Sequence, residues 1–232
     1  MPTHDIIVRE LLLLLSCWLV VAASALAADV RVAITDGPNG SIRQVLAEAV
    51  LDARADSLFA VIADVEQYAS FVPYVVESSI VARDAESIVN YQRLSFGIPF
   101  VSPRHYAIRI RTARASGADG RAVYRIAWNL APEIVLPVEP GAVAVPVNAG
   151  FWQLQDVGGE PPATRVIYCV FTDPGGQLPA WIVYRANAES VPRLFDAVRA
   201  AAIDERRTSA AHPMAPPAAA IEATPTSCKP SG

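Results

Sequence analysis

The segment DPGGQLPAWIVYRAN, which spans residues 173–187, constrains the fold of this chain more than any other. Its first proline lacks a hydrogen-bond donor and its two glycines tolerate a positive φ, so the segment predicts the end of a strand. A long helical pattern begins at Leu178-Pro179, because a proline in the first helical turn costs little. Apolar residues then recur at the spacing of one helix face: Leu178, Trp181, Ile182, Val191, Phe195, Val198 and Ala202. The sequence therefore predicts a long C-terminal helix whose aromatic face needs a covering surface.

The chain before this segment is predicted to supply that surface as an antiparallel sheet. A first strand is expected over residues 42–53, followed by a helix over 57–65 with Asp56 as its N-cap and a short turn over 66–71. Turn-forming residues then separate further strands, which are expected at 74–83, 87–96, 104–115, 121–130, 143–157 and 164–172. Short connections between successive strands favour an antiparallel meander, and the order of the elements indicates an α+β domain.

Two of these strands show the clearest alternation of side chains. In one strand Tyr106, Ile108 and Ile110 alternate with Arg109 and Arg111, and in the next strand Tyr124 and Trp128 share one face. Because successive side chains of a strand point to opposite faces, the pattern predicts one bulky apolar face and one face that carries arginine.

The two ends of the chain differ from its middle. Residues 1–27 are predicted to be a signal peptide, with Arg9 before an apolar run and Ala25-Leu-Ala27 as a cleavage site. The expected location is the periplasm or the exterior; an uncleaved inner-membrane anchor facing the periplasm is the alternative, since the apolar run approaches the ~18 residues that span a bilayer. Residues 28–41 are assigned to an N-terminal extension. Residues 207–232 are Pro/Ala-rich and are expected to be disordered.

Composition and scattered polar residues exclude several functions. The formal net charge of −4 provides no basic field for nucleic acid. No metal-ligand cluster, catalytic constellation or cofactor motif is present, so no catalytic residue, metal or cofactor is predicted. His105 is expected on the arginine-bearing face, as a surface histidine. Cys17 falls in the predicted signal peptide. After processing, Cys169 and Cys228 are interpreted as two unrelated thiols, with a Cys169–Cys228 disulfide as the alternative.

Four short segments carry a family resemblance, and in sequence order they are DVEQYASFVP at 64–73, SPRHY at 102–106, GFW at 150–152 with TRVIY at 164–168, and DPGG at 173–176 with Pro179 and Trp181. Together they resemble the START domain, the lipid-binding branch of the Bet v 1-like helix-grip superfamily. His105 departs from the family's usual aspartate. The resemblance covers about residues 42–202, and the folded domain is assigned to 42–206.

The resemblance implies a helix-grip fold, in which a curved antiparallel sheet wraps around the long C-terminal helix and encloses an apolar cavity for one lipid. It implies an entrance formed by the loops at 96–101 and 131–142 and by the first turns of the last helix. The apolar side chains in the first of these loops support that reading, because a solvated loop is usually polar.

Matched positions give a set of expected ligand contacts: Leu94, Phe96, Ile98, Phe100, Tyr106, Ile108, Tyr124, Trp128, Trp152, Trp181, Ile182 and Phe195. Four of these residues have an ordinary core role as the alternative, since large rings dominate cores: Tyr124, Trp128, Trp152 and Trp181. Arg93 is the expected contact for a polar head group, with a solvated outer-face charge as the alternative. Pro192 should kink the last helix, either as simple curvature or as a hinge.

These features favour an exported, monomeric carrier of one hydrophobic ligand that contacts membrane surfaces transiently. Sterol, hopanoid, phospholipid and quinone all remain open as ligands. A helix-grip enzyme of the cyclase or hydrolase kind is the second hypothesis, and a membrane-anchored interaction module is the third, because a fold alone does not determine a function.

Overall fold

The computed structural model describes residues 29–36, 43–137, 139–176, 178 and 180–204. The expected signal peptide, its cleavage site and the Pro/Ala-rich tail lie outside the described residues. Within the described residues, no helix combines the length and the apolar character that crossing a membrane requires.

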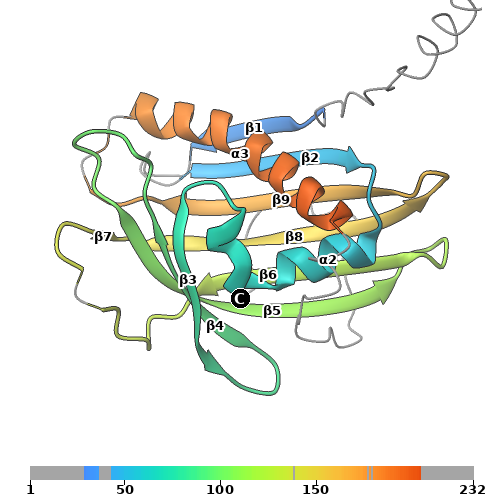
Figure 1. Ribbon diagram of the computed structural model, residues 1–232, viewed down its shortest axis with the longest axis horizontal. Coiled ribbons are helices and arrows are strands. Elements are labelled where there is room, and N and C mark those ends of the chain that lie inside the picture. Colours follow the sequence, from blue (N-terminus) through green and yellow to red (C-terminus); the bar gives the residue numbers. More distant parts are fainter. Residues whose placement is uncertain (1–28, 37–42, 138, 177, 179, 205–232) are drawn as a thin grey trace, which may run out of the picture.

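One curved sheet of nine strands dominates the molecule (Figure 1). Its neighbouring strands are antiparallel, apart from β7, which pairs in parallel with the start of β5. In spatial order the strands are β1 (Arg31–Asp36), β2 (Arg43–Leu51), β9 (Ala163–Asp173), β8 (Val147–Gly158), β6 (Ala122–Leu130), β5 (Arg104–Ser116), β4 (Ile88–Leu94) and β3 (Val75–Arg83), with β7 (Val143–Ala144) off this path. The sheet is not closed, since β1 and β3 remain its two edges.

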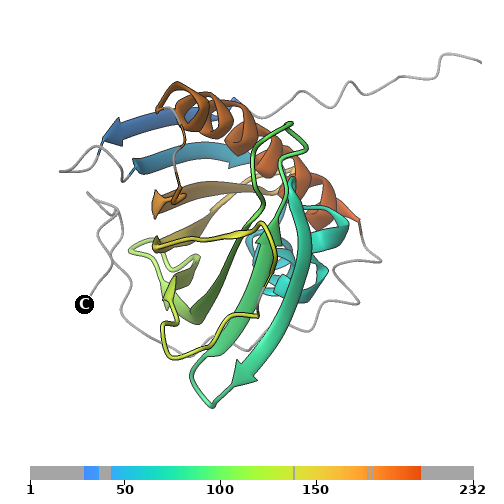
Figure 2. The ribbon, with the colours of Figure 1, turned by 90° about the vertical axis from the view of Figure 1, so that its left-hand side faces the viewer.

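Within the described residues, three helical elements accompany the sheet. They are α2 (Ala55–Ala63), the short 3-10 helix η1 (Val65–Ser70) and the long α3 (Ala180–Ile203). The sheet curves into a trough, and α3 lies across its concave side with its last turns beside α2 (Figures 1 and 2). The expected α+β helix-grip architecture is therefore confirmed.

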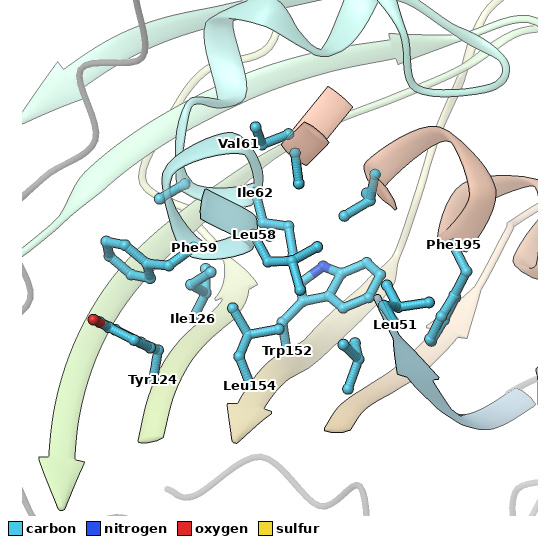
Figure 3. Close-up of a cluster of buried hydrophobic side chains, with 14 of the residues drawn as sticks. Leu51, Leu58, Phe59, Val61, Ile62, Tyr124, Ile126, Trp152, Leu154 and Phe195 are labelled. Atoms are coloured by element: carbon cyan, nitrogen blue, oxygen red, sulfur yellow. The ribbon is translucent and has the colours of Figure 1, made fainter. Parts of the chain in front are cut away.

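The hydrophobic core fills the end of the trough where α2 and α3 meet. Trp152 of β8 lies between Leu58 of α2 and Phe195 of α3 in this cluster (Figure 3), and its ring centroid is 5.4 Å from that of Phe195. Phe59 of α2 stacks on Tyr124 of β6 with centroids 4.9 Å apart. Large rings thus anchor both helices to the sheet at this end, and the other end of the trough is left for a cavity.

Several predicted boundaries were wrong for local reasons. Strand β1 lies within the segment assigned to an extension, and it pairs with β2 along its whole length. The expected single strand over 143–157 is divided into β7 and β8 around Pro146, whose ring nitrogen has no hydrogen to donate to a ladder. The N-cap of α2 is Arg54 instead of Asp56, which lies in the first turn and pairs with Arg54 at 2.7 Å.

The convex face of the sheet is not fully solvated. Ile134 and Leu136, in the connection between β6 and β7, pack on a buried group formed by Val89, Ala107 and Ala131. His105 is buried on this face, with Nδ1 3.3 Å from the Tyr91 hydroxyl. The expectation of a surface histidine was therefore wrong, because strand alternation gives the face of a residue but not what covers that face.

Cys169 is buried beside Phe151 and Ile167, on the face of β9 opposite Tyr168 and Val170. It is disulfide-bonded, so the interpretation as unrelated thiols was wrong. Cys17 and Cys228 both lie outside the described residues, and the Cys169–Cys228 pairing stays a prediction.

Candidate ligand-binding cavity

A cavity of about 260 Å³ lies between the concave face of the sheet, the turn after η1 and the N-terminal half of α3. Alternate residues of β5 form one wall, because their side chains share a face: Arg104, Tyr106, Ile108 and Ile110. The α3 side is lined mainly by residues at helical spacing, which are Val183, Asn187, Ser190, Val191, Leu194 and Val198.

Seven of the expected ligand contacts line this cavity: Leu94, Phe96, Ile98, Tyr106, Ile108, Trp128 and Trp152. Ile182 belongs to α3, but its side chain lies outside what the structure describes. The role of all these residues in ligand binding stays a prediction.

Tyr124 and Phe195 are not among the lining residues, which corrects two of the expected contacts. The Tyr124 ring is covered by Phe59, and Phe195 is fully buried against Trp152. Both residues therefore belong to the hydrophobic core, which for Tyr124 was the alternative interpretation. Leu194, the residue before Phe195, lines the cavity. Two consecutive residues of α3 thus face different surroundings, the cavity and the core.

Phe100 and Trp181 are also outside the cavity. Phe100 is fully exposed at the tip of the β4–β5 loop, and Trp181 is 67% exposed on the first turn of α3. Trp181 shares the apolar spacing of the helix, but Val183 and Asn187 occupy the face that meets the cavity. Sequence periodicity could not resolve this, because the inward face includes the polar residues Asn187 and Ser190.

Arg93 was assigned to the wrong face of its strand. Gln92 and Leu94 on either side of it line the cavity, so Arg93 points to the opposite face. There its Nε lies 3.2 Å from a carboxylate oxygen of Glu77, and both side chains are partly solvated. Arg93 therefore cannot contact a ligand inside the cavity.

A chain of neutral hydrogen bonds forms the polar part of the cavity wall. The Tyr106 hydroxyl donates to Oε1 of Gln92 at 2.9 Å, and the Gln92 amide donates to Oδ1 of Asn90 at 2.6 Å. The Trp128 indole N–H donates to Oδ1 of Asn148 at 2.8 Å. These bonds fix the orientation of the polar groups in the wall. The polar groups add little affinity for the apolar part of a ligand, but they define where the polar atoms of a ligand fit.

Three tyrosines of the cavity wall hold neutral phenols. Burial raises the pKa of Tyr68, Tyr106 and Tyr168 above the ordinary value. Tyr168 packs on Trp152 with centroids 4.5 Å apart, and no described residue hydrogen-bonds its hydroxyl. These phenols are therefore hydrogen-bonding groups and not bases at neutral pH.

Arg104, at the start of β5, is the cation that sequence reasoning missed. It is 4% exposed and lines the cavity. Its Nε and Nη2 donate at 3.2 Å to the carbonyl oxygens of Pro174 and Gly175, and its Nη1 donates to that of Ser102. Burial lowers the pKa of Arg104, and no carboxylate pairs with it among the described residues. The SPRHY motif contained this residue, but nothing local indicated that its neighbours would be neutral.

Gly150 allows one wall of the cavity to lie flat. It pairs across the ladder with Trp128. A Cβ atom at Gly150 would lie 2.2 Å from the Cys169 carbonyl oxygen and 2.5 Å from a ring carbon of Trp128. Only glycine therefore lets the Trp128 indole fold down over strand β8 at this point.

The β4–β5 loop and the start of α3 lie at the end of the cavity away from the core. Phe96 packs against Tyr74 with ring centroids 5.4 Å apart, and Ile98, Val101 and Leu178 also line this end. None of the described residues between 131 and 142 lines the cavity, which corrects the expected second entrance loop.

The family model for polyketide cyclase / dehydrase and lipid transport proteins matches residues 51–199, well over half of the chain. The chain belongs to this family. An uncharacterized protein of Pseudomonas aeruginosa is 26% identical over 155 residues, which are 66% of this chain and 73% of that protein.

Solved structures with the same fold come from bacteria and humans. A STAR-related lipid transfer protein from Xanthomonas axonopodis superposes with a TM-score of 0.61 at 23% identity, over 75% of this chain and 93% of that one. Human StAR-related lipid transfer protein 5 gives 0.61 at 14% identity, over 87% and 95% of the two chains. An aromatase/cyclase from Streptomyces gives 0.51 at 16% identity, over 74% and 99%. The chain therefore has the START helix-grip fold.

The described lining residues of this cavity include few groups suited to acid–base chemistry. No Asp, Glu, His or Cys is among its described lining residues. Over the described part of the chain, no group of three or more such residues could hold a metal ion. The described lining residues can therefore enclose and orient a ligand, but they include no carboxylate or imidazole for proton transfer.

Proposed function

We propose that this protein binds one hydrophobic, lipid-like ligand in the START cavity and carries it between membranes. The observation that carries the proposal is the composition of the cavity wall, which is mostly aliphatic and aromatic and whose described residues include no Asp, Glu, His or Cys. An apolar wall with a few oriented amides and phenols is typical of a binding site.

The energetics of burial favour such a carrier. Each CH₂ group of a lipid costs about 0.8 kcal/mol to expose to water. A ligand that buries roughly 400 Å² gains about 10 kcal/mol before the costs of association. A cavity of about 260 Å³ lies near the lower limit of small-molecule sites, so a compact or single-chain ligand fits the observed form best.

The exposed apolar residues near the cavity supply a membrane-contact surface. Phe100 has a φ of 66°, a left-handed conformation that costs a bulky residue about 1–2 kcal/mol, and it is fully exposed. Trp181 and Tyr184, on the first turns of α3, are exposed as well. Aromatic side chains are favoured at the boundary between lipid and water, so this surface suits transient docking on a bilayer.

We place this activity in the periplasm. The support is the three-part signal pattern of residues 1–27, with export and cleavage as the expected outcome and an uncleaved anchor as the alternative. Bacterial carriers of this kind would move lipid through an aqueous compartment between two membranes.

A cyclase-like enzyme remains the second candidate, because the family description includes polyketide cyclases and dehydrases. The Tyr106, Gln92 and Asn148 side chains could orient carbonyl groups of such a substrate. Proton transfer, however, would fall to tyrosines whose pKa burial raises, which disfavours a base.

The decisive experiment is gentle extraction of the protein from its native envelope, followed by native mass spectrometry and lipid analysis. We expect one intact hydrophobic molecule bound per protein, and transfer of that molecule between labelled vesicles. Conversion of a bound polyketide to a cyclised product would favour the enzyme. Absence of any bound molecule together with absence of vesicle transfer would overturn the carrier.

A further inference from the structure

We infer that the ligand is an anionic amphiphile whose acidic head group binds Arg104, with its apolar part extending along β5 toward the core. This inference rests on the proposed function and assigns a chemical class to the ligand. A carboxylate and a phosphate monoester share the required chemistry, which is a compact anion on an apolar tail.

The first argument is the missing counter-charge. Arg104 is 4% exposed, yet its partners are three neutral carbonyl groups. A buried cation is costly unless an anion compensates it. Other arginines of the chain pair with a carboxylate, namely Arg43, Arg54, Arg93, Arg109, Arg121, Arg165 and Arg199. Arg104 is the cation that lines the cavity, and the ligand is the partner that can supply its charge.

The second argument is the remaining donor capacity of the guanidinium. An arginine side chain has five N–H donors. The bonds to Pro174, Gly175 and Ser102 use one donor on each of the three nitrogens, so each terminal nitrogen keeps one N–H. Guanidinium binds carboxylate and phosphate oxygens strongly through such paired donors.

The nearby acidic residue does not satisfy this cation. The Asp173 carboxylate accepts the Gly175 backbone N–H at 2.9 Å, and no contact joins it to Arg104. Asp173 therefore shapes the turn before α3 and leaves the guanidinium without an anionic partner.

The third argument is the position of Arg104 along the cavity. From Arg104, the inward-facing residues of β5 are Tyr106, Ile108 and Ile110, so the wall becomes apolar with distance from the cation. At about 3.3 Å per residue, these positions extend over roughly 20 Å. Arg104 also contacts the turn that precedes α3 and lies on the side of the β4–β5 loop. A head group at Arg104 would thus lie at the outer end of the cavity, where an amphiphile leaves the membrane surface.

The alternative is that Arg104 only fastens the turn before α3 to β5. A matched pair of probes separates the two roles: hexadecanoic acid, which is ionised at neutral pH, and hexadecan-1-ol, which has the same chain and no charge. Affinities of the full-length protein for each probe are measured by competition against a fluorescent lipid, with thermal stability recorded for every variant.

We expect the wild type to bind the acid at least about tenfold more tightly than the alcohol, as charge-assisted hydrogen bonds require. Arg104→Gln keeps donors for the backbone carbonyls but removes the charge, so it should abolish that preference while the alcohol still binds. Arg104→Lys should keep part of it. Arg93→Gln is the control, since Arg93 carries the same charge on the opposite face, and it should leave the preference unchanged.

Two outcomes would overturn the inference while the carrier proposal survives. One is a wild type that binds the alcohol as tightly as the acid. The other is an Arg104→Gln variant that loses affinity for both probes equally and keeps the wild-type ratio of the two affinities. That result would mean that Arg104 only fastens the turn before α3 to β5. If Arg104→Gln fails to fold, the wild-type preference and the Arg104→Lys ratio still decide. Failure of the wild type to bind either probe would instead overturn the carrier proposal, and this inference with it.

Discussion

The Arg199 guanidinium binds both carboxylate oxygens of Asp52, which joins the last turns of α3 to the end of β2. Phe195 and Val198 are buried in the same half of the helix. The half before Pro192 carries the exposed side chains of Trp181 and Tyr184. Helix α3 is therefore anchored at its C-terminal end, and we expect its N-terminal half, beside the cavity, to be the part that moves.

The Asp52–Arg199 pair gives a pH-dependent contribution to stability. The hydrogen bond from Arg199 lowers the pKa of Asp52 below its ordinary value of about 3.9. Because the folded pKa is the lower one, the carboxylate stabilises the protein above its unfolded pKa and loses this effect as pH falls through the folded pKa. Asp52→Asn should cost about 1 kcal/mol or less at neutral pH, since the carboxylate is half-exposed.

Urea unfolding of wild type and Asp52→Asn at several pH values measures this contribution. The difference between their free energies of unfolding should shrink as pH falls below the ordinary carboxyl pKa. If the difference stays constant down to strongly acidic pH, the stability lost in Asp52→Asn does not come from the charge of the carboxylate.

Pro192 is predicted to act as a hinge. It has no N–H to bond the carbonyl of the preceding turn, so the helix is weakened between its anchored and its exposed halves. Pro192→Ala should stiffen α3 and slow lipid uptake from vesicles while equilibrium affinity changes little. Stopped-flow transfer rates beside equilibrium titrations measure both quantities. An unchanged uptake rate would leave Pro192 with simple curvature as its role.

Phe100 is predicted to serve membrane contact and not stability. Its side chain is fully exposed, so Phe100→Asp should leave the free energy of unfolding within about 0.5 kcal/mol of the wild type. The added charge should nevertheless slow transfer from labelled vesicles severalfold. Val50→Asp, at an exposed position of β2, is the control for an added charge elsewhere. Equal transfer rates for Phe100→Asp and the wild type would remove the β4–β5 loop from the membrane contact.

Two tryptophans that look similar in sequence should respond very differently to truncation. Trp152→Ala removes a buried ring at the junction of core and cavity and should cost about 3–5 kcal/mol. Trp181→Ala should change stability by less than about 0.5 kcal/mol, because that ring is exposed, but it should weaken vesicle binding. Chemical denaturation and vesicle co-sedimentation test the pair, and a large stability loss for Trp181→Ala would mean that its ring is covered in solution.

Export makes a prediction that needs no variant. If the signal peptide is removed after Ala27, intact-mass analysis of the native protein should show Ala28 as its first residue. Cys228 would then be the remaining partner for Cys169, so reduction should add two hydrogen masses. A membrane-bound chain that retains Met1 would favour the anchor instead.

Local patterns predicted much of the fold and little of the polar site. Alternation placed Tyr106 and Ile108 on the concave face, because the period of a strand depends only on neighbouring residues. Arg93 was assigned against that same alternation, and the rule would have corrected it. Arg104 and His105 are different cases. Two of the three neutral partners of Arg104, the carbonyl groups of Pro174 and Gly175, come from residues 70 and 71 positions away, and no sequence period predicts such contacts.

The Trp128 indole lies over a position of β8 where Gly150 has no side chain. One added methyl group would lie 2.5 Å from that ring and 2.2 Å from the Cys169 carbonyl oxygen, so the ring and the neighbouring strand would both have to shift. The shape of this wall therefore depends on a residue that is not among the cavity-lining residues. A single change beneath the wall would therefore alter the cavity without replacing Arg104, Tyr106 or Tyr168. In the proposed carrier, the residue that meets the head group and the residue that shapes the wall along the tail are thus different residues.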